Sequence, residues 1–196
     1  MAKQNKLERT GTLRIIAGRW RGRKLTVMDS AGLRPTPNRV RETLFNWLQA
    51  SLSGANCLDL FAGTGALGLE AASRGVKKVT LVEFNNQAAK QLSQNCQQLG
   101  ADNYQVVNED AVIFLSGDLE QYDIVFIDPP YKSETWSEIA RQLVLQNCLS
   151  VNALIYLEYP LTITRPLLPE HWQLIKEKKA GAVNYCLFKN TVEQAV

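Results

Sequence analysis

The chain has 196 residues, of which 45% are hydrophobic and 21% are charged. These values are ordinary for a soluble globular protein, and the length suits one domain with a full core and a small appendage. The four cysteines stand far apart without a Cys-x-x-Cys pair, which indicates neither a metal site nor a disulfide framework. The polar N-terminus lacks a signal-peptide core, and no apolar run approaches the roughly 18 residues that span a bilayer. We therefore expect a cytoplasmic protein without a membrane partner.

The net charge of +3 conceals a strong asymmetry along the chain. Residues 1–41 hold 11 basic and two acidic residues, a net charge of +9, whereas residues 42–196 hold 11 basic and 17 acidic residues, a net charge of −6. A polybasic arm on a mildly acidic body is the arrangement expected of a catalytic domain that is held on a polyanion. A solvated basic tail is the alternative, but the varied, patterned composition of the arm favours the polyanion.

The arm begins with a stretch that we expect to be disordered over its first dozen residues. Two short β-prone runs follow at 13–18 and 24–27, on either side of a turn that contains glycine. This pattern predicts a β-hairpin.

A helix is predicted to follow the hairpin. Pro37 suits the first turn of a helix, with Thr36 as a candidate N-cap, because proline disfavours helical backbone in the residue before it. Apolar residues then recur at core spacing from Val40 to Leu48, so the helix is predicted to reach about Ala50.

From Cys57 onward, apolar runs alternate with helical patterns. The strands are predicted at 57–61, 79–83, 104–107, 124–128 and 153–158. The helices are predicted at 66–74, 86–99, 111–115 and 135–146. The strand runs are uniformly apolar, as expected when helices cover both faces of a parallel sheet. A closing antiparallel hairpin at 172–178 and 183–188 completes an α/β fold: a doubly wound, mostly parallel, seven-stranded sheet over residues 51–196, with a small hairpin and helix extension over residues 1–50.

The first strand of this sheet runs into a glycine-rich loop. Gly63, Gly65 and Gly68 match the pattern G-x-G-x-x-G between a strand and a helix. Glycines allow a tight turn and close approach of a ligand, and the helix N-terminus offers free N–H groups. Glu83 stands 20 residues after Gly63, at the end of the next strand, where a carboxylate accepts hydrogen bonds from ribose hydroxyls. These features indicate a nucleoside-type cofactor.

The loop alone serves both dinucleotide enzymes and methyltransferases. Asp59 favours the second class, because an acid near the strand end attracts the ammonium group of an amino-acid moiety. Asp110 follows the third strand, where it is placed either to bond an adenine amino group or to cap a helix. The predicted S-adenosylmethionine site consists of Asp59, Phe61, Ala62, Gly63, Thr64, Gly65, Gly68, Glu83 and Asp110.

A second motif, Asp128-Pro129-Pro130-Tyr131, ends the fourth strand. Ligands of open α/β sheets bind at the carboxyl ends of strands near the topological switch point, so we expect this segment beside the glycine loop. An exocyclic amine of a base is a poor nucleophile, because its lone pair is delocalised into the ring. If Asp128 and the Pro129 carbonyl each accept one N–H, the lone pair is freed for methyl transfer, and orientation alone supplies about 7–11 kcal/mol. Asp128 is also a candidate to receive the released proton, and Tyr131 offers a flat face to an unstacked base.

These two motifs resemble those of the class I amino-methyltransferases. With residues 14–25, 34–36 and 41–48, the chain resembles the bacterial 16S ribosomal RNA guanine-N2 methyltransferase family over nearly its whole length. The resemblance implies a Rossmann-like methyltransferase fold and methylation of the N2 amine of one guanine in small-subunit ribosomal RNA. It also implies a substrate presented on an assembled small-subunit particle, and we expect the enzyme to act as a monomer.

The RNA contacts are predicted in the basic arm, where cations surround one aromatic residue. The predicted set is Arg19, Trp20, Arg21, Arg23, Lys24, Arg34 and Arg39. Trp20 is equally suited to anchor the hairpin in the core. Arg41 is a candidate to reach RNA or the rim of the pocket, and pairing with a carboxylate is its alternative role. The alternatives left open are a DNA adenine-N6 methyltransferase, a nicotinamide oxidoreductase and a non-catalytic RNA-binding assembly factor.

Overall fold

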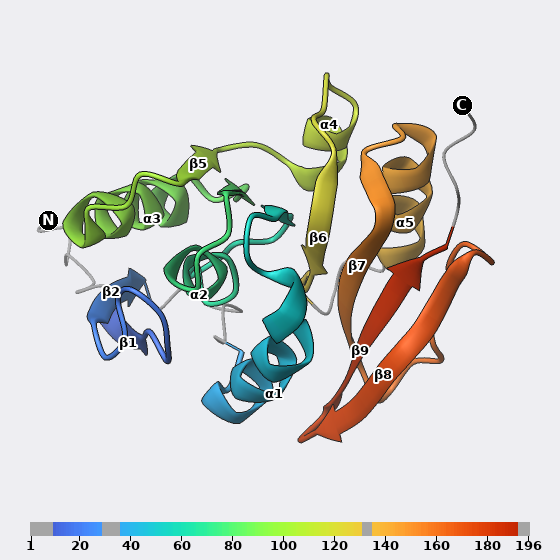
Figure 1. Ribbon diagram of the computed structural model, residues 1–196, viewed down its shortest axis with the longest axis horizontal. Helices are drawn as coiled ribbons and strands as arrows, with labels where there is room; N and C mark the ends of the chain where they lie inside the picture. The colour runs from blue at the N-terminus through green and yellow to red at the C-terminus, as the bar shows by residue number, and fades with distance from the viewer. Residues whose placement is uncertain (1–9, 29–35, 131–134, 192–196) are drawn as a thin grey trace, which may run out of the picture.

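A seven-stranded sheet forms the centre of the protein in a computed structural model that describes residues 10–28, 36–130 and 135–191 (Figure 1). Its strands are β3 (Asn56–Asp59), β4 (Lys78–Val82), β5 (Tyr104–Val107), β6 (Tyr122–Ile127), β7 (Leu149–Pro160), β8 (Trp172–Ala180) and β9 (Val183–Asn190). Their order is β5-β4-β3-β6-β7-β9-β8. The strands from β3 to β7 pair in parallel, whereas β9 pairs antiparallel with both β7 and β8. The predicted doubly wound sheet with its closing hairpin is confirmed.

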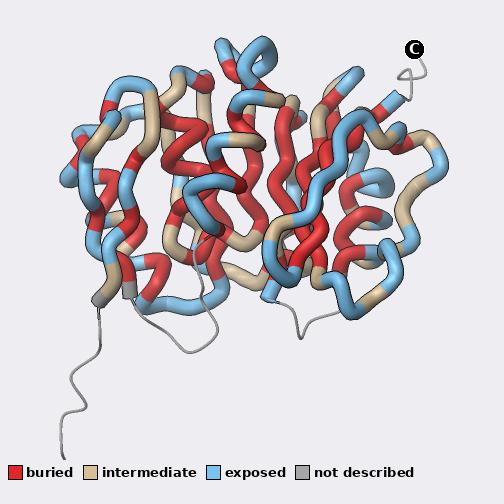
Figure 2. Tube along the Cα trace, turned by 90° about the horizontal axis from the view of Figure 1, so that it is seen from below, coloured by how far each residue is buried: buried red, intermediate tan, exposed pale blue. Residues whose placement is uncertain are grey.

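Helices cover both faces of this sheet. They are α1 (Asn38–Leu48), α2 (Gly68–Ser73), α3 (Asn86–Leu99), α4 (Ala111–Leu115) and α5 (Trp136–Leu145), with a 3-10 turn at Gln49–Ser51. Apolar side chains of α1, α2 and α3 belong to one buried cluster, and those of α4 and α5 belong to a second. The buried strands in Figure 2 therefore lie between two helical layers, which explains their uniformly apolar sequences. Among the described helices, none is long and apolar enough to cross a membrane.

The N-terminal arm forms a separate two-stranded hairpin, β1 (Thr10–Arg14) with β2 (Lys24–Met28). The expected disorder of the first dozen residues is wrong for residues 10–12, which pair with β2, while residues 1–9 lie outside the described part. The first strand ends at Arg14 and not at residue 18. It ends there because the N–H groups of Ile16 and Ala17 leave the hairpin and donate to the Glu70 carboxylate, at 2.8 and 3.0 Å.

Glu70 and Ser73 of α2 fasten the turn of this hairpin to the main domain. The Arg19 N–H donates to the Ser73 carbonyl (2.7 Å), and the Ser73 hydroxyl donates to the Ala17 carbonyl (2.6 Å). Gly18 lies so close that a Cβ there would clash with the Ser73 backbone. The apolar side chains of the hairpin join the cluster of α1 to α3, so the arm and the sheet share one core. A domain boundary near residue 50 stays a prediction.

Helix α1 begins differently from the prediction. Its N-cap is Pro37, without a side-chain cap bond, and the Thr36 hydroxyl instead donates to Asp128 Oδ2 at 3.1 Å. An N-cap hydroxyl would accept from a backbone N–H of the first turn, but this hydroxyl donates to a distant carboxylate, so the N-cap role of Thr36 was wrong. Thr36 thereby becomes a neighbour of the candidate site.

Candidate functional site

The predicted cofactor loop lies at the carboxyl ends of β3 and β4. It is next to the topological switch point between β3 and β6, where the order in which successive strands are added to the sheet reverses. Gly63 and Gly65 have φ values of +50° and +79°, the left-handed region that favours glycine. A Cβ at Gly68 would clash with Leu81 of β4, so the glycine lets α2 pack directly against the strand. The three glycines therefore have the conformational roles that the pattern predicts.

Glu83 ties this loop to the end of β4. Its Oε2 accepts a 2.8 Å hydrogen bond from the Gly63 N–H, and its Oε1 accepts a 2.7 Å bond from the Asn85 N–H. A carboxylate offers about four lone-pair positions, so each oxygen retains one acceptor position for a ligand hydroxyl. These remaining acceptor positions fit the ribose hydroxyls of a nucleoside cofactor.

Asp59 lies beneath the same loop, with only 2% of its surface exposed. Its Oδ2 accepts a 2.9 Å hydrogen bond from the Gly68 N–H. Burial raises the pKa of Asp59 to about 7, against the opposing effect of the backbone hydrogen bonds from Gly68 and Phe61. A nearby cation would favour the ionised form, so this acid suits the ammonium group of an amino-acid moiety.

Asp110 follows β5 and caps α4. Its Oδ1 accepts hydrogen bonds from the N–H groups of Val112 (2.8 Å) and Ile113 (3.3 Å). Of the two alternatives that the sequence left open, the N-cap is confirmed. A bond to an adenine amino group stays a prediction.

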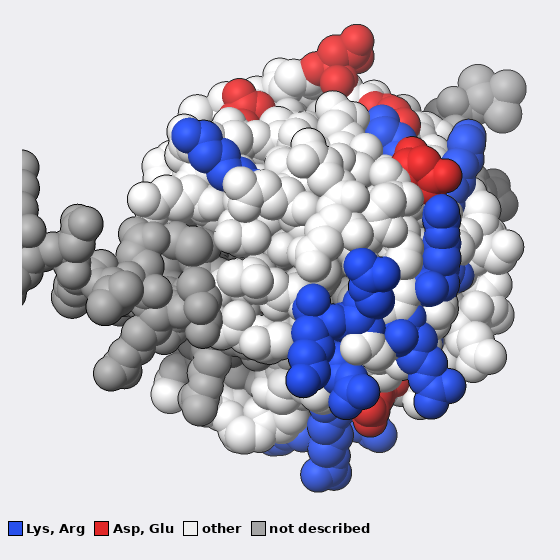
Figure 3. All heavy atoms as spheres, turned by 90° about the vertical axis from the view of Figure 1, so that its left-hand side faces the viewer, with Lys and Arg blue, Asp and Glu red and all other residues white. Residues whose placement is uncertain are grey.

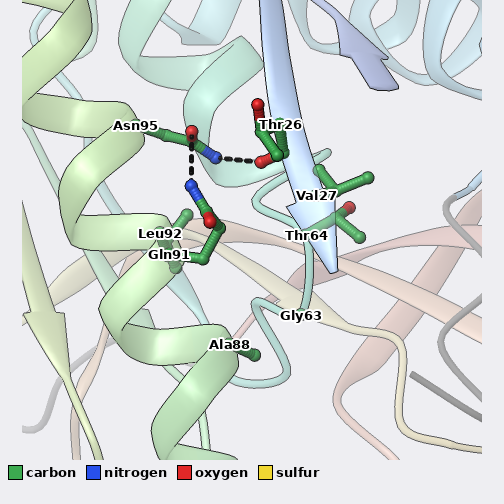
Figure 4. A pocket seen from close by; sticks show the side chains of 8 residues that line it. All are labelled: Thr26, Val27, Gly63, Thr64, Ala88, Gln91, Leu92 and Asn95. Atoms are coloured by element: carbon green, nitrogen blue, oxygen red, sulfur yellow. Dashed lines mark hydrogen bonds between the residues drawn. The ribbon is translucent and has the colours of Figure 1, made fainter. Parts of the chain in front are cut away.

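A small pocket joins the cofactor loop to the N-terminal hairpin, a contact that the sequence did not predict. Figure 4 shows its lining, which consists of Thr26, Val27, Gly63, Thr64, Ala88, Gln91, Leu92 and Asn95. Asn95 of α3 donates to the Thr26 carbonyl of β2 at 2.9 Å, and Gln91 donates to Asn95 at 3.3 Å. The basic arm is thus held directly against the loop that is predicted to bind the cofactor.

Asp128 immediately follows β6, beside the glycine loop as expected. Burial, followed by the negative charge of Glu158, raises the pKa of Asp128 well above its usual value, and the Thr36 hydrogen bond opposes this shift. Pro129 is buried and Pro130 is exposed. Tyr131 lies outside the described residues, so its predicted stacking role stays a prediction. The described part of the motif presents one carboxylate at the edge of the cofactor loop.

Glu158 at the end of β7 is an acid that the sequence analysis did not single out. Its Oε2 accepts a 2.8 Å hydrogen bond from the Tyr156 hydroxyl, and only 3% of its surface is exposed. The sole signal in the sequence is a charged residue at the end of an apolar run. Its proximity to Asp128 depends on strand pairing, which the sequence does not show.

The predicted RNA-binding cations lie on the hairpin and on α1. Arg19, Arg21, Arg23 and Lys24 are exposed, and Figure 3 shows Lys and Arg side chains gathered on the face of the molecule that carries the hairpin. Weak surface contacts orient two of them: Arg19 pairs with Asp102 (3.1 Å), and Arg23 donates to the Gln98 carbonyl (3.1 Å). Arg39 is exposed on α1. Arg34 lies outside the described residues.

Two other residues of the basic segments face inward. Trp20 is 5% exposed and belongs to the core, so its predicted stacking on RNA is corrected to the anchoring role that was the alternative. Arg41 is fully buried, 3.7 Å from Glu70, and donates to the carbonyls of Ala66 and Arg14. This confirms its pairing with a carboxylate.

Comparisons with known proteins identify the family of this chain. Residues 13–189 match the family described as "Conserved hypothetical protein 95". The chain is 46% identical to ribosomal RNA small subunit methyltransferase D of Escherichia coli, over 94% of this chain and 93% of that one. It is also 46% identical to the protein of the same name from Haemophilus influenzae, over 92% and 95%. The solved structure of the proposed methyltransferase yhhF from Escherichia coli superposes with a TM-score of 0.88 at 44% identity, and covers 93% of this chain and 100% of that chain.

Proposed function

Because this chain belongs to the family of small-subunit ribosomal RNA methyltransferases D, we propose that it methylates the exocyclic N2 amine of a guanine in 16S ribosomal RNA, as a monomer acting on small-subunit particles. The methyl donor is S-adenosylmethionine, which supplies an electrophilic methyl group when bound. The observation that carries the proposal is the position of Asp128. This half-buried carboxylate follows β6, next to β3 and its glycine-rich loop, where an amine and a cofactor can meet.

The chain offers groups for each part of the cofactor. The carboxylate of Asp59 suits the ammonium group, and Glu83 suits the ribose hydroxyls. The tight turn at Gly63 and Gly65 leaves room for the ligand beside the backbone. Asp110 caps α4 through one oxygen, and we propose that it also bonds the adenine amino group.

Asp128 and the backbone of Pro129 act on the substrate amine. Each accepts one N–H, which turns the nitrogen lone pair away from conjugation with the ring and aligns it for transfer. Tyr131 provides the face on which the unstacked base lies. The arginines of the hairpin, together with Lys24, Arg34 and Arg39, hold the phosphate backbone near the site.

Labelled-methyl transfer tests the proposal directly. The substrates are naked 16S ribosomal RNA, small-subunit particles that lack the modification, and DNA, each offered with methyl-labelled S-adenosylmethionine. We expect label in N2-methylguanosine, recovered by nucleoside mass spectrometry, with particles preferred over naked RNA. Label in N6-methyladenosine, or transfer to DNA, would contradict the proposal.

A further inference from the structure

Glu158 is a buried carboxylate that the proposed reaction does not use. Ile127 of β6 pairs in register with Leu157 of β7, so the next residues along these parallel strands, Asp128 and Glu158, are neighbours. Phe126 and Tyr156, two residues before Asp128 and Glu158, also pair in register, and their ring centroids are 6.4 Å apart. Because side chains alternate along a strand, Asp128 and Glu158 share the face of these two rings.

The negative charge of Glu158 acts on both of its neighbours, because it adds to burial in raising the pKa of Asp128 and of Tyr156. Burial raises the pKa of Tyr156, which therefore stays protonated and donates its hydroxyl hydrogen to Glu158 Oε2. The Trp136 indole N–H donates to the Glu158 carbonyl at 2.7 Å and fixes the strand end. Among the described residues, Asp59 from β3 also acts on the charge of Asp128, and Tyr185 from β9 acts on Tyr156.

We propose that the charge of Glu158 makes the neighbouring Asp128 carboxylate a strong enough base to take the proton that the target amine loses, an inference that rests on the proposed methyl transfer. The lone pair of the amine nitrogen forms a bond to the methyl carbon as the bond from that carbon to sulfur breaks. The bonding electrons stay on sulfur, S-adenosylhomocysteine leaves, and the nitrogen loses one proton. That proton passes to Asp128, which becomes a neutral acid and afterwards returns it to solvent. Glu158 touches no reacting atom, so it is a positioning residue.

Two adjacent carboxylates, one buried and one half-buried, cannot both ionise easily, so the proton affinity of one depends on the charge of the other. Without Glu158, Asp128 would ionise at lower pH and be a weaker base. Proton-transfer catalysis weakens as the base becomes weaker, so the rate at high pH would also fall. These two effects together distinguish an electrostatic role from simple support of the fold.

The decisive variant is Glu158→Gln, which keeps the size of the side chain and an acceptor for the Tyr156 hydroxyl. The rate of methyl transfer to small-subunit particles is measured from pH 5 to 9. We expect the acid limb of the profile to move to lower pH by about one unit and the plateau rate to fall about tenfold. Glu158→Asp, which retains the charge, should restore the position of the limb. Tyr156→Phe removes one donor to Glu158 and should move the limb the same way by a smaller amount.

A second readout is independent of methyl transfer. In protein labelled with ¹³C at aspartate carboxyl carbons, the Asp128 signal is assigned by its loss in Asp128→Asn and titrated without RNA. Glu158→Gln should lower the titration midpoint of this signal. Glu177→Gln, an acid on β8 that pairs with Arg165, is the matched control and should leave it unchanged.

An unmoved Asp128 titration in Glu158→Gln overturns the inference, whether or not the protein methylates RNA. An active wild type whose variant loses rate without a shift of the acid limb also overturns it. Absence of transfer by the wild type, with a shifted carboxyl titration, instead contradicts the proposed function and leaves the coupling of the two acids intact.

Discussion

The Thr36 hydroxyl donates a 3.1 Å hydrogen bond to Asp128 Oδ2 across 92 positions of sequence. Thr36 directly precedes Pro37, the N-cap of α1, so this bond joins the N-terminal extension to the candidate catalytic carboxylate. The extension therefore contacts the candidate site itself, in addition to carrying the cations that are predicted to bind RNA.

Replacing Thr36 by valine tests this bond. The variant keeps the shape of the side chain but loses the donor, whose bond lowers the pKa of Asp128. We expect the acid limb of the methyl-transfer profile to move to higher pH and the rate at pH 7 to fall about tenfold. Thr36→Ser retains the donor and should behave like the wild type. Equal profiles for the valine and serine variants would show that the hydroxyl has no influence.

Asp128→Ala separates cofactor binding from transfer. The substituted side chain is proposed to contact the substrate amine and not the cofactor, so calorimetry should find the affinity for S-adenosylmethionine within about threefold of the wild type. Methyl transfer should fall by about 10²-fold or more, because the variant loses both an orienting acceptor and a proton acceptor. A variant that methylates RNA at the normal rate would refute the amine-orienting mechanism.

Asp59→Asn should make the free protein more stable at high pH while it weakens cofactor binding. Burial raises the pKa of Asp59 to about 7, so the folded protein binds a proton more tightly than the unfolded chain. The contribution of this group to the unfolding free energy is present below about pH 4 and is lost as the pH rises to about 7. The asparagine removes that loss, an effect of up to about 4 kcal/mol at pH 8.

Urea unfolding at pH 5 and pH 8, with calorimetry of S-adenosylmethionine binding, checks both effects. Exposed Asp118→Asn is the control and should alter neither quantity. If the asparagine at position 59 binds the cofactor as tightly as the wild type, the carboxylate does not hold the ammonium group.

Glu70→Gln should destabilise the fold strongly. The Glu70 carboxylate is fully buried and accepts hydrogen bonds from Ile16, Ala17 and Arg74, with Arg41 3.7 Å away. Its loss leaves the buried Arg41 guanidinium without a compensating charge, which costs about 3–5 kcal/mol. Glu120→Gln, which breaks a partly exposed pair with Lys78, should cost less than about 1 kcal/mol. Similar urea midpoints for the two variants would show that Glu70 does not anchor the hairpin.

The triple variant Arg19→Ala, Arg21→Ala and Arg23→Ala should weaken RNA binding. Each lost phosphate contact reduces the slope of log affinity against log salt by about 0.7–0.9, so the slope should fall by about 2. The control removes three exposed lysines of β8, by Lys176→Ala, Lys178→Ala and Lys179→Ala. Both variants lose the same charge, and only the hairpin variant should lose affinity. Unchanged affinity of the arginine variant at low salt would refute the hypothesis.

The sequence predicted the parallel sheet well, because buried strands between helices have a composition that local patterns reveal. It also predicted the tight turn at the glycine loop, since that turn depends on the backbone of a short segment. The predicted N-cap of α1 was wrong, and the sequence left both RNA stacking and core anchoring open for Trp20, because each of these roles depends on a partner distant in sequence. For Thr36 that partner is Asp128, which is visible only after the sheet has formed.

The same reason explains the missed acids. Glu70 and Glu158 belong to no motif that the sequence analysis used, and each has a partner distant in sequence: Ile16 lies 54 positions from Glu70, and Trp136 lies 22 positions from Glu158. The burial of both acids depends on strand order and helix docking, which a single sequence does not show.

The anchoring of the hairpin turn to Ser73 has a consequence for the order of events during synthesis. The basic arm leaves the ribosome first, yet the residues that fix it in place follow more than 50 positions later. At a synthesis rate of about 5–20 residues per second, roughly 3–10 s pass before Ser73 has been made. The most cationic part of the nascent chain therefore acquires its fixed geometry only after the cofactor loop and α2 have been translated.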